Sequence, residues 1–359
     1  MEFYWNAFGV VNLLLDLAIV GIFFLFIFFN ARLQPSKNTF AIVRQAALAD
    51  LLLWVLCGLF VGGIVGVALI ARTFWTLFTV AMPLLLTFYA INNKKRLFLV
   101  PALLLMVCKY YGEVFEPSRL EVEHAVISVK GLKESVRIAH ISDLQTDGLR
   151  GMHGKVLAAV NGYAPDFIVF TGDVMNHPSL QGEIGAYLHK FKSRHGSFFV
   201  SGNVDHLPDM REFISGAGFE DLDRNYRKIK LPAGNIGVVG LGLEDFSDQA
   251  VLKEMLGKLG KTDATILLSH LPDTLRIAQG LPVTVQFSGH THGGQVCLPF
   301  FGPVLTLSHV ARAIAAGGVH KVGGLYVVVS RGLGMEGHVS PRVRAFCRPH
   351  LILLELKPE

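Results

Sequence analysis

Long runs of apolar residues in the front third of the chain constrain its fold more than any other feature. The runs cover Gly9–Phe29, Ala47–Ala71, Phe74–Ile91 and Leu97–Tyr111. Because about 20 apolar residues cross the core of a bilayer, these runs predict a transmembrane anchor of about four helices within residues 1–112. We expect residues 113–359 to form a separate domain, because single hydrophobic cores rarely grow beyond about 250–300 residues.

Charge and histidine are divided between the same two parts of the chain. Residues 1–112 contain 8 Lys and Arg against 3 Asp and Glu, whereas residues 113–359 contain 25 of each kind. The surplus of positive charge therefore lies among the hydrophobic runs, which indicates a membrane rather than nucleic acid as the partner. All 14 His lie at or after His124, so metal binding or acid–base chemistry is expected in the second part.

The Lys and Arg residues of the short connections predict the orientation in the membrane, because they favour the cytoplasmic side. The basic residues of the first connection are Arg32, Lys37 and Arg44, those of the third are Lys94, Lys95 and Arg96, and the second has only Arg72. Four spans would place the second domain outside the cytoplasm of a multi-pass membrane protein. If the fourth run does not cross the membrane, that domain faces the cytoplasm, and this alternative stays open.

Residues 113–359 alternate short β-branched and apolar runs with helix-like stretches, which predicts a layered α/β domain. The expected strands are Val136–Ile141, Phe167–Phe170, Phe198–Val200, Ile236–Val239, Ala264–Leu268, Val283–Phe287, Leu325–Val329 and Leu351–Leu354. In sheets of this kind, ligands gather at the carboxyl ends of the strands. The polar side chains at five of these ends are Asp143 with Gln145, Asp173, Asn203, His270, and His290 with His292.

These seven oxygen and nitrogen donors suit two divalent cations bridged by one carboxylate. No thiolate is among them, which argues against a structural zinc site and favours Mn, Fe or Zn, with Mg as a further candidate. A single Gly-Asp or Ser-His pair is usually a turn or a cap. The stretch Gly289–Gln295 is more specific, since two imidazoles two residues apart beside three glycines fit poorly in a packed core.

In this order the motifs resemble the calcineurin-like metallophosphoesterase superfamily, in its membrane-anchored bacterial form. The usual family order is Asp-x-His, Gly-Asp, Gly-Asn-His, a lone His and Gly-His-x-His, and the likeness extends from Val136 to Leu354. It implies a four-layer α/β/β/α sandwich and a hydrolase in which a hydroxide between two metals attacks phosphorus. It also implies the ligand set: Asp143, Gln145 and His292 for the first metal, Asn203, His270 and His290 for the second, and Asp173 for both.

Two departures from the family pattern bear on activity. Gln145 stands where the family has a His ligand, and its amide oxygen is a weaker donor than an imidazole. Val204 stands where the family has a His that supports phosphate binding or protonates the leaving group. His206 is a candidate catalytic replacement, oriented by Asp205, although a surface histidine without a role is the alternative. Loss of the acid favours leaving groups of low pKa, so phosphodiesters or pyrophosphates are the expected substrates, ahead of phosphomonoesters.

Three other histidines have expected places. His177 and His338 are candidates for substrate contact because they follow motifs at the expected metal edge, whereas His140 lies within a strand and is expected in the core. Candidate loops for substrate choice are 176–182, 207–224 and 299–316, of which the last is apolar enough to meet a lipid.

The resemblance and the anchor together predict a membrane-bound phosphoesterase acting on a lipid-linked or cell-envelope substrate. One family branch, the UDP-diacylglucosamine hydrolases of lipid A synthesis, suggests such a substrate, although those enzymes act on the cytoplasmic side. The losses at Gln145 and Val204 leave an alternative open, a degenerate phosphoesterase fold that serves as a binding or scaffold protein at the membrane. A transporter is disfavoured, because the spans contain few polar residues beyond Asp16 and Asp50.

Overall fold

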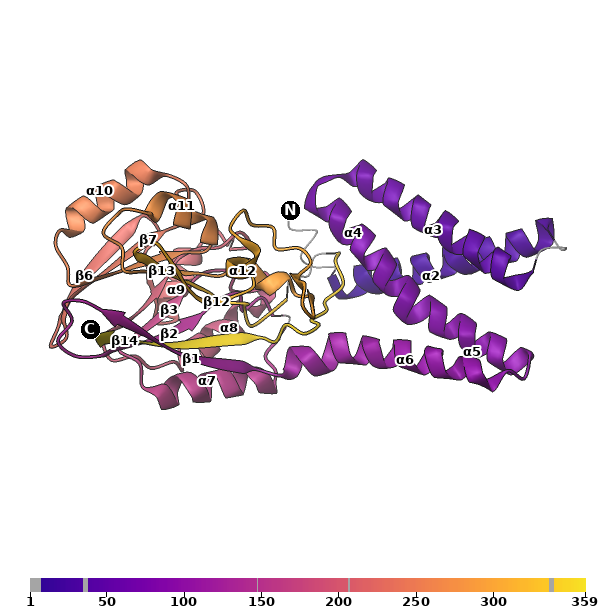
Figure 1. The fold of residues 1–359 in the computed structure, drawn as a ribbon, viewed down its shortest axis with the longest axis horizontal. Helices are drawn as coiled ribbons and strands as arrows, with labels where there is room; N and C mark the ends of the chain where they lie inside the picture. The colour runs from indigo at the N-terminus through magenta and orange to yellow at the C-terminus, as the bar shows by residue number, and fades with distance from the viewer. Residues whose placement is uncertain (1–7, 35–37, 147, 206, 336–338) are drawn as a thin grey trace. The chain divides into compact units, whose positions relative to one another are not determined.

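The chain folds into two compact units in a computed structural model. The structure describes residues 8–34, 38–146, 148–205, 207–335 and 339–359 (Figure 1). The first unit consists of Met1–Phe115 with Glu336–Arg342, and the second consists of Glu116–Met335 with Val343–Glu359.

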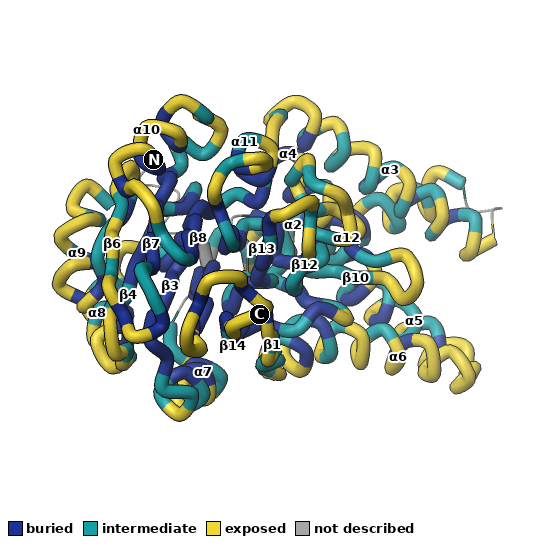
Figure 2. The backbone as a smooth tube through the Cα atoms, turned by 60° about the vertical axis from the view of Figure 1, so that its left-hand side comes forward, coloured by how far each residue is buried: buried dark blue, intermediate teal, exposed yellow. Residues whose placement is uncertain are grey.

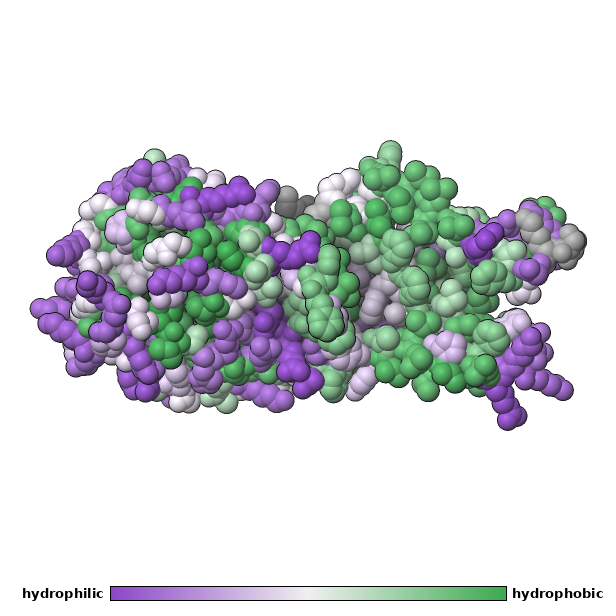
Figure 3. Space-filling model, viewed as in Figure 1, coloured by the Kyte–Doolittle hydropathy of each residue, from purple (hydrophilic) through white to green (hydrophobic). Residues whose placement is uncertain are grey.

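The first unit is helical. Its helices are α2 (Phe8–Leu33), α3 (Thr39–Val61), α4 (Gly63–Thr76), η1 (Leu77–Ala81), α5 (Met82–Asn92), η2 (Arg96–Phe98), α6 (Leu99–Tyr110) and η3 (Tyr111–Phe115). Among the described residues, the segments long and apolar enough to cross a membrane are Val11–Leu33, Thr39–Val61, Val65–Asn92 and Arg96–Ser118. These helices are largely exposed (Figure 2) and hydrophobic on their surface (Figure 3), as expected of segments that have lipid as their solvent.

The turn between the second and third spans differs from the expected position near Arg72. The structure places it at Gly62 and Gly63, whose φ angles are 72° and 56°, a conformation that glycine adopts at little cost. Arg72 instead lies inside α4, where it is buried and its Nε is 3.0 Å from Asp16 Oδ1. Since a paired Arg is tolerated within a span, one continuous run of helix replaces the expected break, and Asp16 has a partner.

The second unit contains two six-stranded mixed sheets. In spatial order the first sheet consists of β1 (Glu121–Val129), β14 (His350–Pro358), β2 (Val136–Ile141), β3 (Phe167–Phe170), β4 (Gly196–Phe199) and β5 (Glu220–Asp221). The second consists of β12 (Gly318–Val322), β13 (Leu325–Val329), β9 (Val285–Ser288), β8 (Ala264–Ser269), β7 (Gly234–Leu241) and β6 (Asn225–Leu231). β2 to β5 are parallel to one another, as are β7, β8, β9 and β13.

Helices cover the outer face of each sheet and complete four layers. Those on the first sheet are α7 (Gly151–Tyr163), α8 (Gln181–Leu188) and α9 (Met210–Gly216), and those on the second are α10 (Gln249–Leu259) and α11 (Leu275–Ala278). Alternate residues of a strand face opposite layers. Val136 and Ile138 of β2 therefore enter the core between the sheets, while Ala139 and Ile141 pack beneath the helices. The predicted four-layer α/β/β/α sandwich is thus confirmed.

His140 lies in the core of this sandwich, as the sequence predicts. Its side chain is fully buried on β2, with Nε2 2.8 Å from Thr171 Oγ1 and the ring edge-on to Phe287. Burial lowers the pKa of His140 to about 3, so the imidazole is neutral in the folded protein at ordinary pH.

A His140→Gln variant is expected to resist acid better than the natural protein. Below about pH 6.5 an unfolded His140 binds a proton that the folded one does not bind until about pH 3. Stability therefore falls as the pH drops, by up to about 1.4 kcal/mol per pH unit from this group. Hydrogen exchange of the β2 amides in the full chain at pH 6.5 and 5 measures the slope of stability against pH. A His189→Gln variant, at an exposed histidine, is the control. Equal slopes for the natural protein and the two variants would contradict the assignment of a buried, neutral imidazole to His140.

Candidate metal centre

The candidate ligands lie on the loops that follow β2, β3, β4, β8 and β9. Five of these ligands have φ in the left-handed region, namely Asp143 (48°), Gln145 (22°), Asp173 (58°), His290 (68°) and His292 (47°). Such backbone costs of order 1–3 kcal/mol per residue and concentrates at functional sites, where the surrounding structure enforces it. The strained backbone therefore indicates that these loops of the second unit serve a function other than stability.

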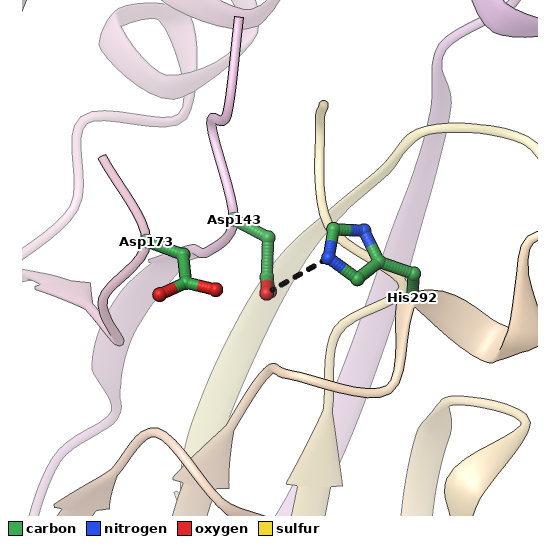
Figure 4. A group of neighbouring side chains, drawn as sticks. All are labelled: Asp143, Asp173 and His292. Carbon is green, nitrogen blue, oxygen red and sulfur yellow. Dashed lines mark ion pairs between the residues drawn. The ribbon is translucent and has the colours of Figure 1, made fainter. Parts of the chain in front are cut away.

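Asp143, Asp173 and His292 converge on one point. Their ligand atoms all lie within 4.8 Å of one another, and all three side chains are buried (Figure 4). His292 Nε2 is 3.4 Å from Asp143 Oδ1, and neither ring nitrogen of His292 has a hydrogen-bond partner among the described residues. Buried polar atoms without partners are rare, so this donor set fits a divalent cation.

Gln145 lies against the same group. Its Nε2 donates a hydrogen bond of 2.9 Å to Asp173 Oδ2, while its buried Oε1 has no partner among the described residues. Asn176 donates to the Gln145 carbonyl at 2.9 Å. The side-chain oxygen that remains is the atom of Gln145 able to coordinate a cation.

Asn203, His270 and His290 form a second group that contacts Asp173. Asn203 Oδ1 is 3.0 Å from His270 Nε2 and 2.8 Å from His290 Nδ1. His270 Nε2 also lies 3.3 Å from Asp173 Oδ2, and its Nδ1 is 2.7 Å from the Thr171 carbonyl oxygen. Asp173 therefore contacts residues of both groups.

Burial and mutual charge set the protonation of the site. Burial lowers the pKa of His290 to about 4 and that of His292 to about 3, so both imidazoles are neutral and able to bind a metal. Burial also raises the pKa of Asp143 to about 7. Burial opposes the charged forms of His270 and Asp173, but their mutual attraction outweighs it, raising the pKa of His270 to about 10 and lowering that of Asp173.

Asp205 organises the loop that carries the second group. Its carboxylate accepts hydrogen bonds from three backbone N–H groups, those of Asp173 (2.8 Å), Val174 (2.9 Å) and Gly202 (2.8 Å). The Val204 N–H donates in turn to Asp173 Oδ1 at 2.9 Å. Burial raises the pKa of Asp205 to about 7. The described contacts of Asp205 thus hold Asp173 in place, a role that the sequence alone does not indicate.

Arg344 is a second residue that sequence reasoning missed. It is the largest fully buried side chain of the described chain, and it donates to the carbonyls of Arg331 (2.8 Å) and Cys347 (3.1 Å). We call these hydrogen bonds the Arg344 clamp. They hold the loop after β13, where the N–H groups of Leu333 and Gly334 donate to the Asp143 carbonyl at 3.0 and 2.7 Å. In the sequence, Arg344 is only an arginine in a loop-like stretch, and such residues are ordinarily exposed.

The remaining predicted site residues are not brought to the ligands by any described contact. His177 begins the short helix η5 (Pro178–Leu180), and its Nδ1 lies 2.5 Å from Ser179 Oγ and accepts from the Ser179 N–H at 3.1 Å. His206 and His338 lie outside the described residues.

Comparison with known proteins agrees with this geometry. Residues 136–294 match the family model described as calcineurin-like phosphoesterase. The metallophosphoesterase YkuE of Bacillus subtilis is 29% identical over 269 residues, which cover 69% of this chain and 89% of that protein. The UDP-2,3-diacylglucosamine pyrophosphatase LpxG of Chlamydia trachomatis is 26% identical over 277 residues, which cover 61% of this chain and 82% of that protein.

A further relative, a metallophosphoesterase of Campylobacter jejuni, is 28% identical over 260 residues, which cover 66% of this chain and 63% of that protein. Among solved structures, the NAD nucleotidase of Haemophilus influenzae aligns with a TM-score of 0.39 and 16% identity, covering 55% of this chain and 45% of that one. The chain therefore carries a calcineurin-like phosphoesterase domain over residues 136–294. It is a metallophosphoesterase, a hydrolase of a family that uses divalent metals, and it carries four helices compatible with a membrane.

Proposed function

We propose that this enzyme hydrolyses a phosphodiester or pyrophosphate bond of a lipid-linked substrate at the membrane surface, using two divalent cations. The observation that carries the proposal is that Asp173 lies close to two groups of donors, Asp143 with His292 and His270 with Asn203. One carboxylate shared by two neighbouring clusters is the arrangement of two-metal phosphoesterase sites.

Each candidate ligand would have a distinct role. Asp143, Gln145 and His292 would hold one cation, Asn203, His270 and His290 the other, and Asp173 both. When bound, the cations supply Lewis acidity toward the phosphoryl oxygens and the means to deprotonate a water at neutral pH. The protein keeps His290 and His292 neutral by burial, so both present lone pairs. Asp205 and the Arg344 clamp hold Asp173 and Asp143 in place, and burial excludes bulk water from the carboxylates.

The lipid-linked substrate is supported by two independent features. The four apolar helices keep the hydrolase domain close to a bilayer. The relative LpxG is named a pyrophosphatase of a diacylated sugar nucleotide, which has both an acyl-chain part and a phosphate linkage. We place the hydrolase domain outside the cytoplasm, because the connections around Lys37 and Lys94 are basic and four spans return the chain to the side of its amino terminus.

The metal content of the full chain, with hydrolysis of bis-p-nitrophenyl phosphate in the presence of manganese, tests the proposal. About two cations per chain and manganese-dependent turnover would support it. Fewer than one tightly held cation and no turnover would favour the alternative, a scaffold on a degenerate fold, which the replacements at Gln145 and Val204 motivate.

A Val204→His variant is expected to gain activity toward esters with poor leaving groups. Val204 is mostly buried beside Asp173, and a valine supplies no proton to a leaving oxygen. Since a general acid contributes about 10²–10⁴ in rate, we expect at least a tenfold rise in the ratio of glycerol 2-phosphate to bis-p-nitrophenyl phosphate turnover. Val204→Leu is the matched control. An unchanged ratio in a Val204→His protein with normal metal content would contradict the role of this position.

A further inference from the structure

The second unit exposes its large apolar side chains in one place. Among its described residues, seven of these exposed side chains gather at Leu298, Phe300, Phe301, Val304, Leu305, Leu307 and Phe346. The remaining one is Val126, which lies on β1. Single exposed apolar residues are ordinary on a protein surface, but a contiguous group marks a site of interaction.

Six of the seven lie on one hairpin, which we call the apolar hairpin and define as residues 297–307. In it, β10 (Cys297–Leu298) pairs antiparallel with β11 (Gly302–Pro303), and Phe300 between them is completely exposed. The Cys297 N–H donates to the Ala345 carbonyl at 2.9 Å, which brings the segment bearing Phe346 beside the hairpin. The seven side chains therefore form one surface drawn from two segments.

The apolar hairpin is fastened to the loops of the candidate metal centre. Its Cys297 Sγ donates a hydrogen bond of 3.1 Å to the carbonyl of Gly293, the residue after His292. Gly294, two residues after His292, packs so closely that an added Cβ would lie 2.7 Å from the Leu305 carbonyl oxygen. Just beyond the hairpin, Ser308 Oγ donates to Asp273 Oδ2 at 2.6 Å, and the His309 N–H donates to Asp273 Oδ1 at 2.9 Å.

The composition of the apolar hairpin and the residues after it indicates what this surface contacts. Residues 296–316 contain no Asp or Glu, and Arg312 is their single Lys or Arg. Its guanidinium lies 4.4 Å from the centre of the Phe301 ring, so the cation is held beside the apolar surface. Exposed aromatic and aliphatic side chains with an adjacent cation suit the boundary between acyl chains and anionic headgroups. The helices of the same chain keep such a boundary within reach.

We propose that the apolar hairpin inserts its tip into the lipid surface of the membrane that holds the N-terminal helices, and thereby presents lipid-borne phosphates to the metal centre. Because the hairpin is bonded to Gly293 and abuts Gly294, insertion fixes the metal-binding loops at the headgroup level. The second half of this inference rests on the proposed function, while insertion itself does not.

Photo-cross-linking of the full chain in nanodiscs of phosphatidylethanolamine and phosphatidylglycerol tests insertion. p-Benzoylphenylalanine replaces Phe300 in one variant, Leu305 in a second, and Val126 in the matched control, all of which are exposed apolar positions. We expect lipid adducts, identified by mass spectrometry, at least tenfold more abundant at positions 300 and 305 than at position 126. The second hairpin variant preserves the test if the first does not fold.

The other outcomes overturn the proposal. Equal labelling at all three positions, or no lipid adducts in folded hairpin variants, would exclude specific insertion. Adducts to a second copy of the chain would identify a dimer interface, and adducts to another protein would identify a protein-docking surface. The readout does not depend on turnover. An unaltered chain that holds fewer than one cation and does not hydrolyse bis-p-nitrophenyl phosphate would therefore overturn the proposed function and leave the result on insertion intact.

Discussion

Replacing Asp173 with asparagine is expected to lower turnover of bis-p-nitrophenyl phosphate by a factor on the order of 10³. The side chain keeps its size, so the effect comes from the lost charge. Asp173 accepts hydrogen bonds from Gln145 and Val204 and lies 3.3 Å from His270 Nε2. An amide at this position cannot supply the negative charge that two neighbouring cations share, so we expect at least one of them to be lost.

Metal analysis and steady-state kinetics on the full chain measure this effect. Asp209→Asn is the matched control, because Asp209 is exposed and its side chain does not cap the helix that follows. The control should retain the metal content and the rate of the natural protein. An Asp173→Asn protein with two cations and a rate within tenfold of normal would show that this carboxylate does not bridge the metals.

Replacing Gly289 with alanine is expected to be the most disruptive change of a single methyl group in the site. An added Cβ would lie 1.9 Å from Ser142 Oγ and 2.2 Å from Asp143 Oδ2, distances at which the carboxylate must move. The His290 N–H now holds that carboxylate with a hydrogen bond of 3.0 Å to Oδ1. Displacing a reacting or ligating group by about 1 Å costs about 10²-fold in rate, and overpacking costs about 1–3 kcal/mol in stability.

Gly257→Ala serves as the comparison for this variant. Gly257 is exposed on α10 and an added Cβ would meet nothing within 4 Å, so alanine there should stabilise slightly, by about 0.5–1 kcal/mol. The melting temperatures of the two proteins should therefore change in opposite directions, and only the Gly289→Ala protein should lose metal and turnover. Normal metal content and turnover in the Gly289→Ala protein would mean that the loop relaxes and that Asp143 is not held by close contact with this glycine.

Much of the second unit could be predicted because its strands are buried on both faces. All eight expected strands are present, and β2, β3 and β13 have the expected bounds. The outer strands β6 and β12 were missed because they lie at sheet edges and mix polar with apolar residues. β1, at an edge of the first sheet, was missed as well, because polar residues interrupt its apolar ones. An edge strand exposes one side to water, so the continuous apolar run that reveals a central strand is not required of it.

Arg72 shows where a rule based on composition fails in the first unit. A charged residue between apolar runs was taken to end a span, but Asp16 supplies its counter-charge from another helix. The two glycines that form the actual turn lie inside an apolar run, where they interrupt no hydropathy pattern. Only the pairing between helices, which is invisible along the chain, distinguishes an interior arginine from an interfacial one.

The candidate ligands were predicted by type and order, because each follows a strand that ends at the same edge of its sheet. The sequence by itself determined the class of the enzyme and the layered fold and predicted the set of candidate donors, since these depend on local patterns and on motif order. The tertiary structure alone decided that Asp205 and Arg344 hold the ligand loops and that the apolar hairpin is fastened to Gly293, beside His292. Those roles arise from hydrogen bonds between loops distant along the chain, and no spacing rule specifies which buried carbonyl or N–H group a side chain will reach.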